Sequence, residues 1–229
     1  MPMSGPPASD DPGTPVFRPG VDLRADLGQL LAKGAVHVAG ALAQRFLGEL
    51  VEELSHAEYA PVPPAVGQVR QQSAAVSMSA PFDGWPLLQE LVTAVVSAVT
   101  LGPPLIPSLD DWRPNEAYIQ RYEQGSVGIT PHRDSKAQSL LMAVLTVEGS
   151  ARFSICSDRA GTTIAEWSVG PGDLILLRGA GLAGEEDGRP LHAVSGPVSG
   201  SRVSVLISMQ RSTPTLVHPE TITAPPPEA

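Results

Sequence analysis

The sequence predicts an α+β fold in which helices come first and short strands follow. Amphipathic segments with helical periodicity lie in the first half of the chain, whereas the part after Pro114 consists of short β-prone segments separated by turn residues. The chain also contains 22 glycines and 24 prolines among 229 residues, which favours many turns over long helices. We therefore expect the strands to form a barrel or a two-sheet jelly roll, supported by the N-terminal helices.

The distribution of proline predicts the domain organisation. Residues 1–20 contain six prolines, and residues 212–229 include Pro225, Pro226 and Pro227. Neither segment can bury enough apolar surface to offset its ordering entropy, so both are expected to be flexible tails. A single domain is expected over residues 21–211, with a helical part at 21–110 and a strand-rich part at 111–211.

Two helices are expected in the helical part. Between residues 40 and 56, apolar side chains recur at helical spacing, at Leu42, Phe46, Leu47, Leu50, Val51 and Leu54. The second helix is expected over residues 85–99, with Pro86 in its first turn. Segment 61–64, which is rich in proline, and the small polar residues of segment 68–79 predict an extended, mobile connection between these helices.

Five short strands are expected in the second part of the chain. Each is rich in β-branched or apolar residues, and turn signals such as the Gly-Pro-Gly-Asp sequence at 170–173 separate them. The predicted strands cover residues 117–122, 140–147, 152–157, 173–177 and 202–209.

Charge, cysteine content and hydropathy exclude several classes of protein. Lys and Arg number 15 and Asp and Glu number 24, so the net charge of 15 − 24 = −9 disfavours a general nucleic-acid binder. No apolar run reaches the roughly 18 residues of a membrane helix, and residues 1–11 show no signal-peptide pattern. The single Cys156 cannot form an internal disulfide, which favours the reducing cytoplasm.

Three residues form a candidate metal site. His132 and Asp134 are two positions apart, so on an extended segment their side chains point to the same face. His192 lies 58 residues after Asp134 and follows a predicted strand. Two imidazoles and one carboxylate leave three open positions on an octahedral iron, which is the ligand set of non-haem Fe(II) oxygenases. The other histidines, His37, His56 and His218, have no comparable neighbours, and His37 is expected to be a structural histidine.

A candidate anion site follows ten residues after His192. Arg202 and Ser204 share one face of a predicted apolar strand. A guanidinium in such a strand is costly unless it meets an anion, and its two parallel donors match a carboxylate. The alternative is a surface strand with Arg202 in solvent.

These residues together resemble the Fe(II)/2-oxoglutarate-dependent oxygenases. The resemblance covers about residues 115–209 and lies in the order of the motifs, which is H-x-D, then His, then R-x-S. It implies a double-stranded β-helix, which is a cupin-like jelly roll, with the metal ion in its mouth. It also implies that His132, Asp134 and His192 bind Fe(II), and that Arg202 and Ser204 bind the distal carboxylate of 2-oxoglutarate.

The layout of the segment before the H-x-D motif is similar to the AlkB-like branch of this family. In that branch an Asn and a Tyr precede the motif, and here Gln120 and Tyr122 stand at these positions, so both are implied to line the co-substrate site. AlkB-type enzymes carry a second Arg six residues after the first, whereas this chain has Ser208 there. The R-x-S pair is more similar to the branch of plant and antibiotic-pathway oxygenases.

The resemblance implies a dioxygenase that converts 2-oxoglutarate and O₂ into succinate and CO₂ while it oxidises a substrate C–H bond. Related halogenating enzymes lack the carboxylate ligand, so Asp134 favours hydroxylation, demethylation or desaturation. The expected substrate is a small-molecule metabolite or a natural-product intermediate. A candidate lid over residues 65–78 contains no aromatic residue and a single cation, Arg70, which is poorly suited to stacking a nucleobase.

Two other functions stay open at this point. The first is an AlkB-like oxidative demethylase of alkylated nucleic acid or nucleotides, which the acidic composition disfavours. The second is a non-catalytic, cupin-like metal-binding protein. The acidic run Glu185-Glu186-Asp187 is expected to be a solvated loop, and its position before His192 leaves a cationic substrate open.

Overall fold

The computed structural model describes residues 14–100 and 106–211. The expected C-terminal tail and residues 1–13 of the expected N-terminal tail lie outside the described residues. Val16 is buried and Phe17 forms a β-bridge with Leu42, so the packed chain begins before residue 21. None of the described helices combines the length and the apolarity that a bilayer span requires.

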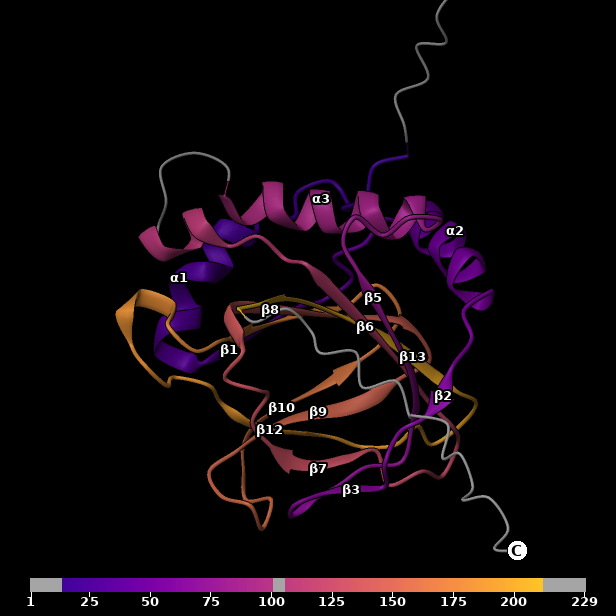
Figure 1. Cartoon of the computed structure of the whole chain (residues 1–229), viewed down its shortest axis with the longest axis vertical. Helices are drawn as coiled ribbons and strands as arrows, with labels where there is room; N and C mark the ends of the chain where they lie inside the picture. The colour runs from indigo at the N-terminus through magenta and orange to yellow at the C-terminus, as the bar shows by residue number, and fades with distance from the viewer. Residues whose placement is uncertain (1–13, 101–105, 212–229) are drawn as a thin grey trace, which may run out of the picture.

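Two antiparallel sheets form the strand-rich part of the molecule (Figure 1). The large sheet has seven strands, in the order β1 (Ala35–Val38), β11 (Leu174–Arg178), β8 (Gln138–Glu148), β13 (Arg202–Gln210), β6 (Glu116–Tyr122), β5 (Ala74–Ser79) and β2 (Ala60–Pro61). The small sheet has four, in the order β10 (Thr163–Val169), β9 (Ala151–Cys156), β12 (Leu191–Val194) and β7 (Ile129–His132). The hairpin of β3 (Ala65–Val66) and β4 (Val69–Arg70) adjoins β7.

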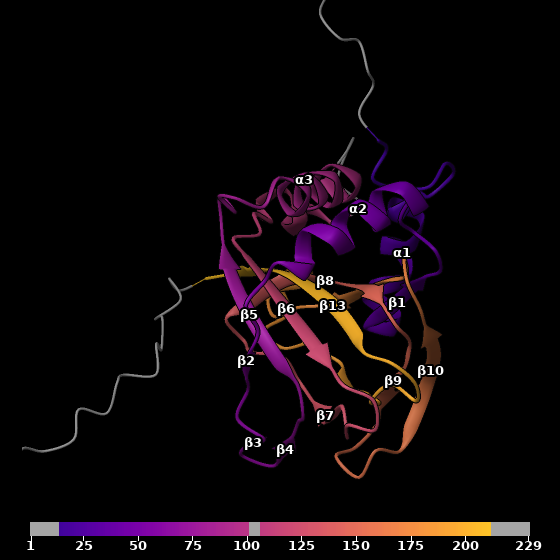
Figure 2. The same cartoon turned by 90° about the vertical axis from the view of Figure 1, so that its right-hand side faces the viewer.

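The helices cover the outer face of the large sheet, on the side away from the small sheet (Figure 2). They are α1 (Leu23–Lys33), α2 (Gln44–Ser55) and α3 (Pro86–Thr100). The largest apolar cluster lies between these helices and the sheet, and it includes the fully buried Phe46 of α2 and Leu88 of α3. The predicted arrangement of supporting helices and a two-sheet jelly roll is therefore confirmed.

Strand β8 shows why a continuous apolar run can be a strand here. Alternate side chains of a strand point to opposite faces, so Leu141, Ala143 and Leu145 pack under the helices. Met142 instead joins a second cluster, which lies between the two sheets and includes Phe153 of the small sheet. Both faces of β8 are covered, and therefore no polar alternation is needed.

The predicted helices and strands are confirmed within a few residues at their ends, but the pattern missed several shorter elements. Helix α1 was not predicted; the Asp22 side chain caps its N-terminus, and Gly34 ends it in a left-handed conformation. Strands β1, β7, β10 and β12 were also not predicted. Strand β7 contains Pro131, which is tolerated because β7 is the edge strand of its sheet.

The segment expected to be an extended connection between the helices requires a correction. It contains the four strands β2 to β5, and β5 pairs along its whole length with β6. Ala75 and Met78 of this segment are buried, so the segment is part of the large sheet rather than a simple connection. The sequence pattern failed here because alanine and serine have low strand propensity and only pairing with β6 orders them.

His37 has the structural role that the sequence predicted. It lies on β1, and its Nε2 atom is 3.0 Å from Oδ2 of Asp173. The same carboxylate accepts hydrogen bonds from the backbone N–H groups of Gly40 and Gly170. The Asp173 carboxylate therefore links β1 to the turn that precedes β11.

Candidate metal centre

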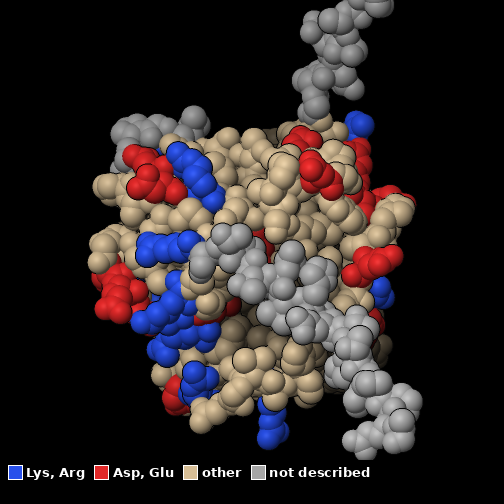
Figure 3. Space-filling view, in the orientation of Figure 1, with Lys and Arg blue, Asp and Glu red and all other residues tan. Residues whose placement is uncertain are grey.

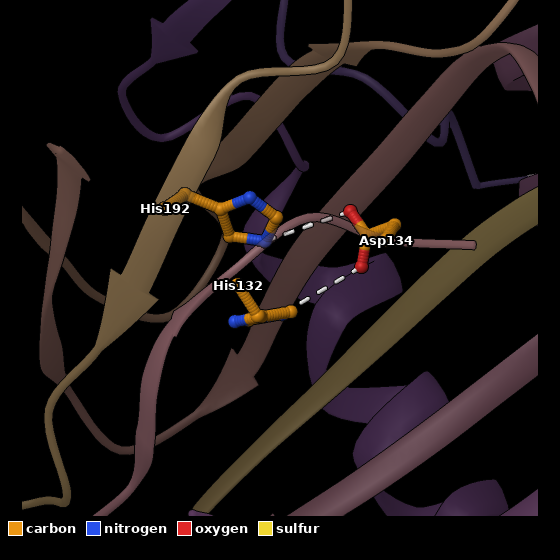
Figure 4. A group of neighbouring side chains, drawn as sticks. All are labelled: His132, Asp134 and His192. Carbon is orange, nitrogen blue, oxygen red and sulfur yellow. Dashed lines mark ion pairs between the residues drawn. The ribbon is translucent and has the colours of Figure 1, made fainter. Parts of the chain in front are cut away.

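The three predicted ligands converge between the two sheets (Figure 4). His132 ends β7, His192 lies on the adjacent β12, and these two residues are directly paired in the strand register. Asp134 follows β7 and turns its carboxylate toward both rings. Its Oδ1 atom is 3.7 Å from Nε2 of His132, and its Oδ2 atom is 3.5 Å from Nε2 of His192. One donor atom from each residue lies within 4.8 Å of the others.

Backbone carbonyls fix the orientation of both imidazoles. Nδ1 of His132 lies 2.9 Å from the carbonyl oxygen of Thr130, and Nδ1 of His192 lies 3.3 Å from that of Pro190. A carbonyl oxygen only accepts, so Nδ1 is the ring nitrogen that carries a proton, and in the neutral imidazole the lone pair of Nε2 is free to bind a metal. Hydrogen bonds of this kind are the usual second layer around metal-binding histidines. The Phe153 ring stacks on the His192 ring, with 5.3 Å between the two ring centres, and this contact restricts rotation of the imidazole.

The electrostatics of the site favour metal-binding protonation states. Burial lowers the pKa of His192 to about 4, although Asp134 opposes this shift, so the imidazole is neutral at neutral pH. Burial also acts to raise the pKa of Asp134, but the two histidines and Arg189 outweigh it and hold the pKa below its ordinary value. A neutral imidazole and an ionised carboxylate are the forms that coordinate a cation.

The donor set fits Fe(II). Two imidazole nitrogens and one carboxylate oxygen converge from one side, which matches the facial 2-His-1-carboxylate set that leaves open positions for other ligands. A structural zinc site would instead require four protein ligands. Among the described residues, His132, Asp134 and His192 form the only group of metal-binding side chains that is this compact.

Arg202 lies in the same pocket and is 1% exposed. Its Nη1 donates to Oγ of Ser204 at 3.3 Å, and its Nη2 donates to Oγ1 of Thr146 at 3.0 Å. No described carboxylate lies within ion-pair distance, and its buried Nε has no hydrogen-bond partner. Burial lowers the pKa of Arg202, which shows how poorly this charge is compensated by its surroundings. A buried guanidinium with a free donor is a site for an anion.

The other predicted pocket residues are arranged around Arg202. Tyr122 is opposite Arg202 in the register of β6 and β13, and Gln120 is opposite Ser204. The Arg202 guanidinium carbon is 5.7 Å from the centre of the Tyr122 ring. Burial raises the pKa of Tyr122 to about 12, so its hydroxyl is a neutral donor. Ile129, Val144 and Leu206 complete a largely apolar lining.

Sequence reasoning missed Thr146 and Arg189. Thr146 is buried and anchors Arg202, and it could have been found as the one hydroxyl residue in the apolar strand predicted at 140–147.

Arg189 donates from Nη1 to the backbone carbonyl of Asp134, and its Nε and Nη2 both contact Asp187 at 2.7 Å. In return, Nε of Arg133 donates to the carbonyl of Arg189 at 3.1 Å. We call this reciprocal pair, Arg133 and Arg189, the arginine clamp.

The arginine clamp joins the two segments that carry the metal ligands. One segment is the loop after β7, with Asp134, and the other leads into β12, with His192. No sequence signal marked this interaction, because it joins side chains to backbone carbonyls 55 and 56 residues away.

The chain was compared with known proteins in sequence and in structure. Its sequence matches no protein-family model and no curated protein. A Pseudomonas putida prolyl-4-hydroxylase aligns with a TM-score of 0.58 at 17% identity, over 83% of this chain and 100% of the hydroxylase. A prolyl hydroxylase from Trichoplax adhaerens, solved with a hypoxia-inducible-factor peptide, aligns with a TM-score of 0.56 at 11% identity, over 80% and 87% of the two chains.

A third solved structure is similar to the same extent. It is a Burkholderia pseudomallei oxidoreductase of the 2OG-Fe(II) oxygenase family, with a TM-score of 0.55 at 13% identity, over 83% of this chain and 92% of that one. At such identities the likeness establishes the fold, which is the double-stranded β-helix that the sequence predicted.

Proposed function

We propose that this chain is an Fe(II)/2-oxoglutarate-dependent dioxygenase that oxidises a C–H bond of a small-molecule metabolite or natural-product intermediate. The observation that carries the proposal is one pocket that holds both the His132–Asp134–His192 donor set and the buried, uncompensated charge of Arg202. A cation site next to an anion site is what a metal ion and a dicarboxylate co-substrate require together.

Each pocket residue has a role in this proposal. His132, Asp134 and His192 would hold Fe(II), which supplies the activation of O₂ when it is bound. Arg202 would bind the distal carboxylate of 2-oxoglutarate, with Ser204 and Thr146 holding its guanidinium in place. Tyr122 would donate its neutral hydroxyl to the co-substrate, and Gln120 would line the same end of the pocket.

The overall reaction would balance as follows. Substrate R–H, 2-oxoglutarate and O₂ give R–OH, succinate and CO₂, so one oxygen atom enters the substrate and the other enters succinate. The apolar side chains of Val144, Phe153 and Leu206 would exclude water from the reacting C–H bond. Demethylation or desaturation would use the same residues with a different substrate.

Anaerobic spectroscopy tests this proposal. Addition of Fe(II) and 2-oxoglutarate should produce a weak visible charge-transfer band in the wild type and in H56A, which removes the exposed histidine at the C-terminal cap of α2. The band should be absent in H132A. In air, the wild type should release succinate slowly without substrate, and H132A should not. A wild type that shows neither the band nor succinate release would instead support the cupin-like, non-catalytic alternative.

A further inference from the structure

The acidic loop before His192 offers no free negative charge to a substrate. Glu185 pairs with Arg178 at 2.6 Å, and Glu186 pairs with Lys136 at 3.4 Å. Asp187 pairs with Arg189 at 2.7 Å, as part of the support of the arginine clamp. Each of the three carboxylates therefore has a cation of the protein within 3.4 Å, so the loop presents no unpaired carboxylate to a cationic substrate.

Three exposed arginines surround the strand that carries His132, and we call them the arginine rim: Arg70, Arg133 and Arg159. Arg70 lies on β4, and its backbone N–H donates to Oγ1 of Thr130 at 2.9 Å. Arg159 reaches from the β9–β10 loop, and its Nη1 donates to the carbonyl of Pro131 at 3.4 Å. Each arginine thus lies next to residues 130–132 although the three come from different parts of the chain.

The arginine rim carries uncompensated positive charge. Within the described ranges 14–100 and 106–211, none of its guanidinium groups has a carboxylate within 4.0 Å, and the contacts of Arg133 and Arg159 are to carbonyl oxygens. The neighbouring Asp158 accepts from the backbone N–H of Thr162 instead. Figure 3 shows Lys and Arg along the left side and the lower edge of this face, with some acidic residues beside them, while further acidic residues gather beside α2.

We propose that the arginine rim selects a small substrate that carries a carboxylate or phosphate group. This inference rests on the proposed function, because it identifies the substrate class of the same site. On a chain of net charge −9, three cations without an ion-pair partner among the described residues, beside the strand that carries His132, raise the local concentration of anions on that side of the molecule. The β3–β4 hairpin next to the rim has no aromatic residue, and a strongly acidic surface repels an extended polyanion, so a small anion fits better than nucleic acid.

Equilibrium dialysis of the full-length protein tests the proposal with simple probes. The protein is kept anaerobic with Fe(II) and saturating 2-oxoglutarate, so that Arg202 is already occupied. The probes are phenylphosphonate, phenylacetate and benzyltrimethylammonium, which share a ring and differ in charged group. Phenylphosphonate, phenylacetate or both should bind, and the anion that binds identifies a phosphate or a carboxylate as the recognised group.

Matched charge variants locate the binding. The double variant R70Q/R159Q, which leaves the arginine clamp intact, should bind the anionic probe several-fold more weakly at low ionic strength. The control R24Q/K33Q removes two cations from α1, outside the large sheet, and should change affinity less than twofold. Absence of the Fe(II)–2-oxoglutarate band in the wild type would contradict the proposed function. The difference in probe affinity between the wild type and the rim variant, measured without metal, would still report on the rim, because Arg202 is the same in both proteins.

Several outcomes would overturn the assignment of a small anion. These are failure of both anions to bind, equal affinity in the rim variant and the wild type, or preferential binding of benzyltrimethylammonium. A ten-nucleotide single-stranded DNA that bound more tightly than both anions, and that lost affinity in the rim variant, would identify nucleic acid as the substrate class instead.

Discussion

At the scale of single residues, Arg202 is the side chain whose environment is hardest to explain without a ligand. A guanidinium that is 1% exposed, with one free donor and no described counterion, carries a large desolvation cost. Its two hydroxyl partners and the Tyr122 ring compensate only part of this cost. A bound carboxylate would supply the missing counterion and accept a hydrogen bond from the free donor of Arg202.

Arg202→Met separates a ligand-binding role from a structural one. We expect the Kd for 2-oxoglutarate to rise by about 30-fold or more, because a charged, buried hydrogen-bonding pair contributes about 2 kcal/mol or more. Without 2-oxoglutarate, the free energy of unfolding should stay equal or increase, since an uncompensated buried charge is removed. Titration of the charge-transfer band and urea unfolding measure the two quantities. Strong destabilisation with unchanged Kd would show that Arg202 is structural.

Arg189 is expected to be a positioning residue, because it contacts the backbone of Asp134 and not the metal position itself. Arg189→Gln should weaken Co(II) binding about 10- to 100-fold, as loss of outer-layer support does at other metal sites, and should alter the visible Co(II) spectrum. Arg189→Lys should restore part of the affinity. The control R113Q should leave both readouts unchanged, and a normal Co(II) spectrum in Arg189→Gln would refute the positioning role.

At the scale of elements, the metal site depends on how β7 docks against β12. Gly128 precedes β7 at φ +69°, and a Cβ atom there would lie 2.1 Å from the carbonyl oxygen of Val194. Only glycine allows this close approach, which fixes the register that pairs His132 with His192. Sequence patterns do not reveal such an approach, because Gly125, three residues earlier, looks the same in the sequence and has nothing within 4 Å.

The two glycines provide a matched pair of substitutions. Gly125→Ala and Gly128→Ala both place alanine at a positive φ, which costs about 1–2 kcal/mol of stability. Gly128→Ala should cost more and should also lower Co(II) affinity, since the backbones of β7 and β12 must separate. Chemical denaturation and metal titration measure the two effects. Equal metal affinity in both variants would show that β7 does not need this docking to hold His132.

At the scale of the whole molecule, the candidate site lies between the two sheets and is lined by residues from both. A ligand that binds the folded state alone stabilises it by about 2.7 kcal/mol at a concentration of 100 times its Kd. Fe(II) should therefore raise the melting temperature under anaerobic conditions, and 2-oxoglutarate should raise it further. Chelation should reverse both increases, and His132→Ala should abolish them. A melting temperature that is insensitive to metal would contradict a preformed site.

The sequence by itself determined the elements with strong periodicity and the three candidate metal ligands. The helices around Phe46 and Leu88, the strands around Leu145 and Val205, and the ligand trio were all predicted, because apolar spacing and the H-x-D pattern are local properties. Weakly periodic strands such as β5 and β7 were missed, because they are ordered by pairing with β6 and β12 rather than by the strand propensity of their own residues.

Only the tertiary structure decided what surrounds the site. It brought Thr146 to Arg202, clamped Asp134 to Arg189, paired the acidic loop with nearby cations, and left Arg70 and Arg159 unpaired beside β7. The physical reason is that these contacts join residues far apart in the chain, so their charges are paired or left free by packing alone. The residue types indicate which ligands a site could bind, and the packing around the site determines which of these ligands fit it.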